Sequence, residues 1–204
     1  MNDFDDLFKF EEQVSDFFGA SYGVAVDCCT HGLELCLRLS DQQTIICPKK
    51  TYVSVPFMLE KLNLNYIWDD NFWSEYYHLT PTIIDAATFW RKNGFVKNTK
   101  MCLSFHFKKH LNIGRGGMIL LDNLSDYKKL VKMRYDGRSI HNGVLYDDDQ
   151  IEEIGYHYYM TPETAREGLS VFSHKRDALP TIITSNDYSD VTELPYFKKK
   201  ATST

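Results

Sequence analysis

Residues 104–117 combine a lysine with several glycines in an order that could support covalent chemistry. The segment leaves an apolar run at Ser104, passes Lys108 and Lys109, and reaches a Gly-x-Gly-Gly turn at 114–117 that leads into the next apolar run. A lysine held at a strand end beside another cation can be deprotonated enough to form a Schiff base. Glycines in the turn allow close approach of the backbone. Taken alone, the segment also fits a solvated surface loop.

Asp85 closes the apolar run that begins at Ile83. A carboxylate at the end of a buried strand destabilises the fold unless a cation pairs with it. A pyridinium nitrogen is one such cation, and the pairing would keep that nitrogen protonated so that its ring can act as an electron sink. The alternative is that Asp85 caps the N-terminus of a helix.

Two further positions could bind a flat, phosphorylated molecule. Residues 27–30 join a predicted strand to a predicted helix, and the free amides at such a junction suit a phosphate. Tyr52 follows the strand that ends at Cys47, where its ring could stack on a flat cofactor. The alternatives are that Thr30 is a plain helix cap and Tyr52 a core residue.

The elements that must position these residues alternate between helix and strand. Apolar periodicity predicts helices at 4–18, 31–39, 53–62, 126–135 and 162–179, and strands at 22–26, 44–47, 65–68, 82–87, 101–107 and 117–122. This alternation predicts an α/β domain with a mostly parallel sheet. Ligands of such folds bind at the carboxyl ends of the strands, which places 27–30, 48–52, 85–88 and 104–109 along one rim.

Composition narrows the class of protein. The chain has 204 residues, 43% of them hydrophobic, and a net charge of −5, which favours one globular domain and argues against nucleic-acid binding. No run approaches the roughly 18 apolar residues of a membrane span, and the acidic N-terminus does not resemble a signal peptide. Five cysteines without framework spacing indicate free thiols in a reducing compartment. We therefore expect a cytoplasmic protein with neither nucleic-acid nor membrane partners.

A metal site is not predicted. Adjacent Cys28 and Cys29 make poor ligand geometry, and the chain has no Cys-x-x-Cys pair. His106 and His110 flank Lys109 in a strand-to-loop segment, where four-residue spacing does not place them on one helix face.

Several spaced motifs, taken together and in this order, resemble one known family. They are the junction 27–30, Pro48-x-x-Thr51-Tyr52-Val53-Ser54, Asp85-Ala86-Ala87, Ser104-Phe105-x-x-x-Lys109-x-x-x-x-Gly114-x-Gly116-Gly117, Arg134-x-x-Gly137, and Gly155-Tyr156-His157-Tyr158-Tyr159-Met160-Thr161. This order resembles the DegT/DnrJ/StrS family of fold-type I aminotransferases, which use pyridoxal 5'-phosphate (PLP) to aminate nucleotide-linked keto sugars. The resemblance implies a three-layer α/β large domain with a mixed sheet.

The resemblance also implies catalytic roles. Lys109, selected over Lys108 by the spacing from Ser104 and to the glycines, would form the Schiff base and then move the proton. Asp85 would face the pyridine nitrogen. The other implied cofactor-binding residues are Cys29, Thr30 and Ser104 at the phosphate, Tyr52 on the ring, and Thr88 beside the phenolic oxygen.

A homodimer with composite active sites is implied as well. In the family, an asparagine of the turn that corresponds to 155–161 reaches the phosphate of the partner subunit. His157 stands at that position here and could do the same if protonated.

The sequence also departs from the family pattern. Thr88 replaces the usual Gln or His, Cys29 a glycine, and Arg115 an acidic or small residue, and the link from Asp69 to Thr82 is short. We expect residues 1–180 to be the PLP-binding domain, with a long excursion at 138–160, and 181–204 to be a tail. The family's C-terminal small domain would then be largely absent, and a separate polypeptide could supply it.

Three readings remain open on the sequence. The first is transfer of an amino group, with glutamate as donor, to a keto sugar nucleotide. The second keeps PLP but changes the reaction to dehydration, decarboxylation or work on another amino compound, as Thr88 and the missing C-terminal domain suggest. The third is a non-catalytic binding subunit, which the joint presence of Lys109, Asp85 and Ser104 argues against.

Overall fold

The computed structural model describes residues 4–41, 44–138 and 151–201. Its elements in chain order are α1 (Asp5–Phe18), β1 (Tyr22–Val26), α2 (Cys29–Arg38), β2 (Ile46–Pro48), α3 (Ser54–Lys61), β3 (Ile67–Asp69), β4 (Tyr77–Thr80), β5 (Ile83–Asp85), β6 (Lys100–Ser104), β7 (Gly117–Leu121), α4 (Leu124–Met133), α5 (Pro162–Lys175), the 3₁₀ turns η3 (Ser185–Asp187) and η4 (Val191–Glu193), and α6 (Pro195–Ala201). Each helix and strand predicted from periodicity has a counterpart here, whereas β4 and α6 were not predicted.

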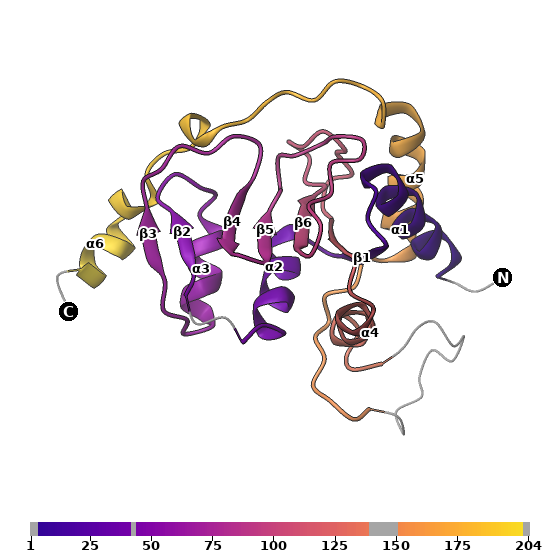
Figure 1. The fold of residues 1–204 in the computed structure, drawn as a ribbon, viewed down its shortest axis with the longest axis horizontal. Coiled ribbons are helices and arrows are strands. Elements are labelled where there is room, and N and C mark those ends of the chain that lie inside the picture. Colours follow the sequence, from indigo (N-terminus) through magenta and orange to yellow (C-terminus); the bar gives the residue numbers. More distant parts are fainter. Residues whose placement is uncertain (1–3, 42–43, 139–150, 202–204) are drawn as a thin grey trace.

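A mixed sheet forms the centre of the molecule. Its five strands follow the order β1-β7-β6-β5-β4, and the parallel pair β2–β3 continues the row beyond β4 (Figure 1). The expectation of a mostly parallel sheet is wrong in one respect, because β5–β6 is the single parallel pair among the described strands of the larger sheet. A two-residue turn joins β4 to β5, and no helix lies between β6 and β7, so both connections return the chain antiparallel.

Helices cover both faces of this sheet and make the expected three layers. On β6, Met101 and Leu103 face the core under α1 and α5, while Cys102 faces the core under α2, α3 and α4. The strands β6 and β7 are buried on both faces, which explains why they read as continuous apolar runs.

Glu11 of α1 and the motif residue Arg134 meet at the edge strand β1. Glu11 accepts a hydrogen bond from the Ala25 N–H (2.7 Å) and forms a buried ion pair with Arg134, which donates to the Ala25 carbonyl (2.8 Å). Gly137 and Gly155 lie against each other, and a Cβ on Gly155 would sit 1.7 Å from the Gly137 nitrogen. A bridge between Tyr159 and Val26 then returns the chain to β1. Residues 139–150 of the predicted excursion at 138–160 lie outside the described residues.

The C-terminal tail crosses the molecule. From α5 it runs over the row of strand ends to the far edge of the sheet, where α6 packs near β3 (Figure 1). Phe197 of α6 contacts Phe57 and Trp68, and Lys200 pairs with Glu60 at 2.6 Å.

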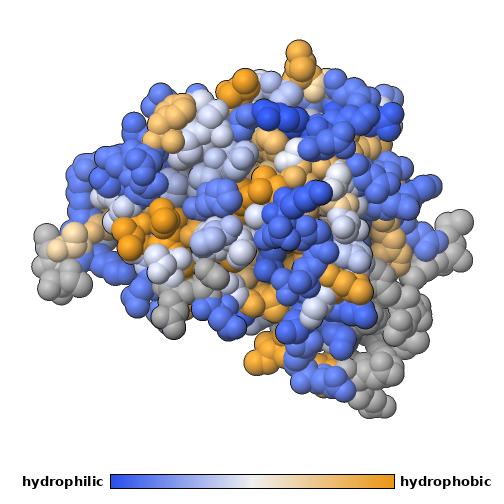
Figure 2. All heavy atoms as spheres, in the orientation of Figure 1, coloured by the Kyte–Doolittle hydropathy of each residue, from blue (hydrophilic) through white to orange (hydrophobic). Residues whose placement is uncertain are grey.

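The surface carries hydrophobic side chains in separate patches among hydrophilic ones on the face shown in Figure 2. Among the described residues, no helix has the length and apolar character needed to cross a membrane.

Candidate active site

A cavity of about 1200 Å³ opens at the rim formed by the strand ends. It is lined by seven of the eight residues predicted from the sequence to form the site: Cys29, Thr30, Tyr52, Asp85, Thr88, Ser104 and Lys109. They come from four strand–loop junctions that are far apart in the sequence. The exception is His157.

Asp85 ends β5 and is buried, with 5% of its surface exposed. Its Oδ2 accepts a hydrogen bond from the hydroxyl of Tyr77, its cross-strand partner on β4 (2.6 Å), and its Oδ1 accepts one from the Ala87 N–H (2.9 Å). Burial raises the pKa of Asp85 and outweighs the opposing effects of these donors and of the Lys109 charge. The helix-cap alternative is wrong, because residues 86–92 form turns instead of a helix.

Lys109 lies in the loop after β6 and is half-buried. Its N–H donates to the His106 carbonyl (2.8 Å), which fixes a tight turn. Burial lowers the pKa of Lys109, although the charge of Asp85 acts in the opposite direction. The neighbouring Lys108 is exposed, with its Nζ 5.7 Å from the Phe107 ring centroid. The structure therefore places Lys109 in the environment that a nucleophilic amine needs.

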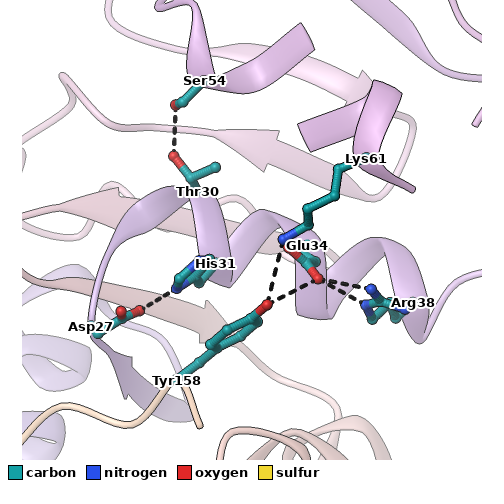
Figure 3. Close-up of polar contacts among 8 residues, drawn as sticks. All are labelled: Asp27, Thr30, His31, Glu34, Arg38, Ser54, Lys61 and Tyr158. Atoms are coloured by element: carbon teal, nitrogen blue, oxygen red, sulfur yellow. Dashed lines mark hydrogen bonds and ion pairs between the residues drawn. The ribbon is translucent and has the colours of Figure 1, made fainter. Parts of the chain in front are cut away.

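The N-terminus of α2 faces the same cavity. No side chain within the described part of the chain caps it, and its first turn contains no acid, so its amides remain available to an anion. Thr30 and Ser54 lie beside it with their hydroxyls 2.7 Å apart (Figure 3). Ser104 of β6 pairs in register with Gly117 of β7. A Cβ atom on Gly117 would lie 2.5 Å from the backbone nitrogen of Cys29. Glycine at 117 thus lets β7 begin directly against this helix end.

Tyr52 and Thr88 line the cavity in different ways. The Tyr52 ring is 59% exposed, so it is available for stacking and is not a core residue. Thr88 donates its hydroxyl to the Glu75 carbonyl at 2.6 Å. Its side chain therefore supports the segment at residue 75.

His157 is not among the residues that line the cavity of its own chain. Its side chain is 70% exposed, and Nδ1 lies 3.0 Å from an Asp136 oxygen. The structure therefore does not bring His157 to the other seven residues within one subunit.

An ion-paired cluster flanks the N-terminus of α2. His31 lies 2.6 Å from Asp27 and stacks on Tyr158 with ring centroids 3.7 Å apart (Figure 3). Burial lowers the pKa of His31, but the hydrogen bonds that its ring makes to Asp27 and Cys28 outweigh this effect and raise the pKa to about 9. The ligating atoms of Asp27, Cys28 and His31 lie within 4.8 Å of one another, yet the second Asp27 oxygen pairs with Arg115 at 2.8 Å. Both carboxylate oxygens thus face cations of the chain.

Sequence reasoning missed the residues of the link at 73–77 and of the C-terminal tail. Trp73, Glu75, Tyr77 and Tyr188 all line the cavity. Alternation in the short run at 77–80 was a weak signal for β4. The tail offers no periodic signal, because Tyr188 reaches the cavity from irregular structure.

These residues fit PLP as the group implied by the resemblance. The chain offers the buried Asp85 only neutral donors at hydrogen-bonding distance among its described residues, which leaves it suited to a cationic ring nitrogen. The uncapped helix end suits a phosphate, and Lys109 suits covalent attachment.

Comparisons with known proteins bear on the family and the fold of the chain. The sequence profile of the DegT/DnrJ/EryC1/StrS aminotransferase family matches residues 4–88 and 86–176. No curated protein sequence matches the chain.

Solved structures share the fold. AtS13 from Actinomadura melliaura has 18% sequence identity and a TM-score of 0.72, over 83% of this chain and 60% of that one. The sugar aminotransferase CalS13 from Micromonospora echinospora has 16% identity and a TM-score of 0.68, over 83% and 60%. PseC of Helicobacter pylori, an aminotransferase involved in the biosynthesis of pseudoaminic acid, has 15% identity and a TM-score of 0.63, over 82% and 57%. The chain thus spans less than two thirds of the length of these proteins. Because the family profile covers most of its residues, the chain belongs to the DegT/DnrJ/EryC1/StrS aminotransferase family.

Proposed function

We propose that this chain binds PLP and acts as an aminotransferase, moving an amino group from a donor such as glutamate to a keto sugar nucleotide. The observation that carries the proposal is the presence of Lys109 and Asp85 in one cavity, the first with a lowered pKa and the second buried with a raised one. Groups with such perturbed pKa values in a cavity are typical of catalytic sites.

The bound cofactor would supply an electron sink for the substrate carbon. Lys109 would hold it covalently and, once displaced by an amino substrate, would accept and return a proton at Nζ. Asp85 would hold the proton of the ring nitrogen at its carboxylate, and Tyr77 fixes the orientation of that carboxylate. Tyr52 would cover one face of the ring.

The phosphate would bind at the N-terminus of α2. The amides of that helix end, the hydroxyls of Thr30 and Ser54, and Ser104 provide donors without a protein acid in the first turn. Cys29 contributes its backbone amide, because its side chain is directed to the Cys102 carbonyl at 3.5 Å.

Cationic side chains at the cavity support an anionic acceptor. Lys108, Arg115 and Lys175 line it. A diphosphate-linked sugar carries the complementary charge. The similarity to a protein described as a sugar aminotransferase supports the same class of acceptor.

We also propose a homodimer in which His157 acts on the phosphate of the partner subunit. Its exposure, and the fixed loop that presents it beyond its own cavity, support this role. Mixing Lys109→Ala with His157→Ala subunits tests it: regained turnover is expected from sites that combine the intact residues, and no gain over either variant would contradict it.

A visible absorbance spectrum after incubation with PLP tests the central proposal. We expect a band for the Schiff base in the wild type and none at that wavelength in Lys109→Ala, with Lys108→Ala as the matched control that keeps the band. A wild type without the band would overturn the proposal.

Addition of glutamate separates the reaction types. A shift to the pyridoxamine form supports transamination. Because the Thr88 hydroxyl is bound to Glu75, a different PLP reaction remains the second candidate. It predicts a band that glutamate does not convert.

A further inference from the structure

The C-terminal tail lays a strap, defined here as residues 179–190, across the cavity. Backbone hydrogen bonds hold it to the link before β4: the Glu75 N–H donates to the Ile183 carbonyl (2.8 Å), and the Ser185 N–H donates to the Trp73 carbonyl (2.9 Å). In Figure 1 the strap passes over the row of strands from α5 toward α6. It is therefore a fixed part of the cavity wall.

The strap carries Tyr188 into this cavity. The Tyr188 ring is half-buried and packs on Trp73, with centroids 5.5 Å apart, and Trp73 in turn packs on Tyr77 at 5.0 Å. Tyr77 is the residue that donates to Asp85. A continuous aromatic column thus connects the strap to the acid of the site.

The hydroxyl of Tyr188 makes no hydrogen bond to the residues that the structure describes at 4–41, 44–138 and 151–201. Burial, followed by the negative charges of Asp85 and Asp187, raises the pKa of Tyr188 to about 12. The hydroxyl therefore stays protonated at neutral pH and is available as a donor.

Thr88 cannot serve as that donor while it keeps its present contact. A hydroxyl has one proton, and that of Thr88 is given to the Glu75 carbonyl. The phenolic oxygen of PLP, which the resemblance places beside Thr88, carries negative charge and needs a donor when it is removed from water.

We propose that Tyr188, from the C-terminal strap, donates a hydrogen bond to the phenolic oxygen of bound PLP. This inference rests on the proposed function. It makes the strap part of the cofactor site, and it assigns to residue 188 a task that Thr88 does not perform.

Titration of the holoprotein tests the assignment through its visible spectrum. Tyr188→Phe keeps the ring and removes only the hydroxyl, so we expect PLP to bind about tenfold more weakly. The pH at which the visible band converts from its protonated to its deprotonated form should also rise by about one unit. Without a hydrogen bond from residue 188, the phenolate holds the proton of the adjacent Schiff-base nitrogen more tightly.

Two variants serve as controls. Tyr196→Phe, whose hydroxyl lies on α6 near Glu60, should match the wild type in both measurements. Thr88→Val should lower the unfolding temperature by removing the Glu75 contact but leave the transition pH of the band unchanged.

The outcomes separate this inference from the function on which it rests. If the wild type shows no band with PLP, the proposed function and this inference both fail. If the wild type shows the band and Lys109→Ala does not, but Tyr188→Phe has the transition pH of the wild type, the inference alone is overturned. This holds whether or not the affinity for PLP falls. A shift in Thr88→Val in place of Tyr188→Phe would assign the donor to Thr88.

Discussion

Two buried acids of this molecule have opposite surroundings. Glu34 on α2 is fully buried, with Lys61 at 2.5 Å and Arg38 at 2.9 Å (Figure 3). Burial raises the pKa of Glu34, but the hydrogen bonds that these two cations donate outweigh this effect and lower the pKa. Asp85 is also buried, but its hydrogen-bond donors among the described residues are all neutral, namely the Tyr77 hydroxyl, the Ala87 N–H and the Cys29 thiol, and burial raises its pKa.

Under the proposed function, this difference separates an acid that holds the fold together from one that would bind a ligand. A buried carboxylate without a cation costs stability unless something compensates it. At Glu34 the chain supplies the compensation, between α2 and α3. At Asp85 the described chain leaves that place to a cation from outside, as a PLP ring nitrogen would provide.

Removing the charge of Asp85 should give the largest effect and separate the two acids. We expect Asp85→Asn to reduce turnover by about 10²–10³-fold, because the charge that holds the ring proton is lost. The unfolding temperature should stay unchanged or rise, because a buried charge is removed. Steady-state kinetics and thermal unfolding check this, with Asp16→Asn on the exposed face of α1 as control. A large loss of stability would contradict the assignment.

The same change at Glu34 should have the reverse outcome. Glu34→Gln leaves Lys61 and Arg38 without their carboxylate and should reduce the free energy of unfolding by about 2–3 kcal/mol. PLP binding per folded molecule should stay at the wild-type level. Denaturant unfolding compares it with Glu12→Gln, an exposed residue of α1. Equal stability of the two variants would show that the Glu34 network contributes nothing.

The smallest expected effect concerns the cluster beside the helix end. Because the pKa of His31 is raised from 6.5 to about 9, its stabilising effect is fully present below pH 6.5 and is lost as the pH rises through about 9. His31→Gln should therefore be less stable than the wild type by about 1–2 kcal/mol at pH 6, and this difference should shrink above pH 9. Denaturant unfolding at several pH values, with His174→Gln as control, measures it. A difference that is independent of pH would contradict the charged state of His31.

The comparison also shows what a sequence can reveal about this site. Lys109, Asp85 and Thr30 were predicted because each stands next to an apolar run, so strand order alone brings them to one rim. Tyr77 was not predicted as the partner of Asp85, because β4 is short and irregular and its register depends on pairing with β5. Tyr188 reaches the cavity through backbone contacts with the link at 73–75, and local sequence carries no sign of such contacts.

The role of Glu34 was equally hidden in the sequence. On α2 it stands one helical turn before Arg38, which reads as an ordinary exposed pair. The packing of α3 and of Tyr158 encloses it, and both contacts come from residues distant in the chain.

The protonation of Asp85 with and without the cofactor tests the central claim most directly. Carbon-13 NMR of labelled aspartate carboxyls, with Asp85→Asn to assign the signal, gives the pKa of Asp85 in each state. We predict a value above the ordinary range for an aspartate in the free protein, and a fall when PLP binds and its ring nitrogen pairs with the carboxylate. A pKa that PLP leaves unchanged would contradict the claim that Asp85 is kept for that cation.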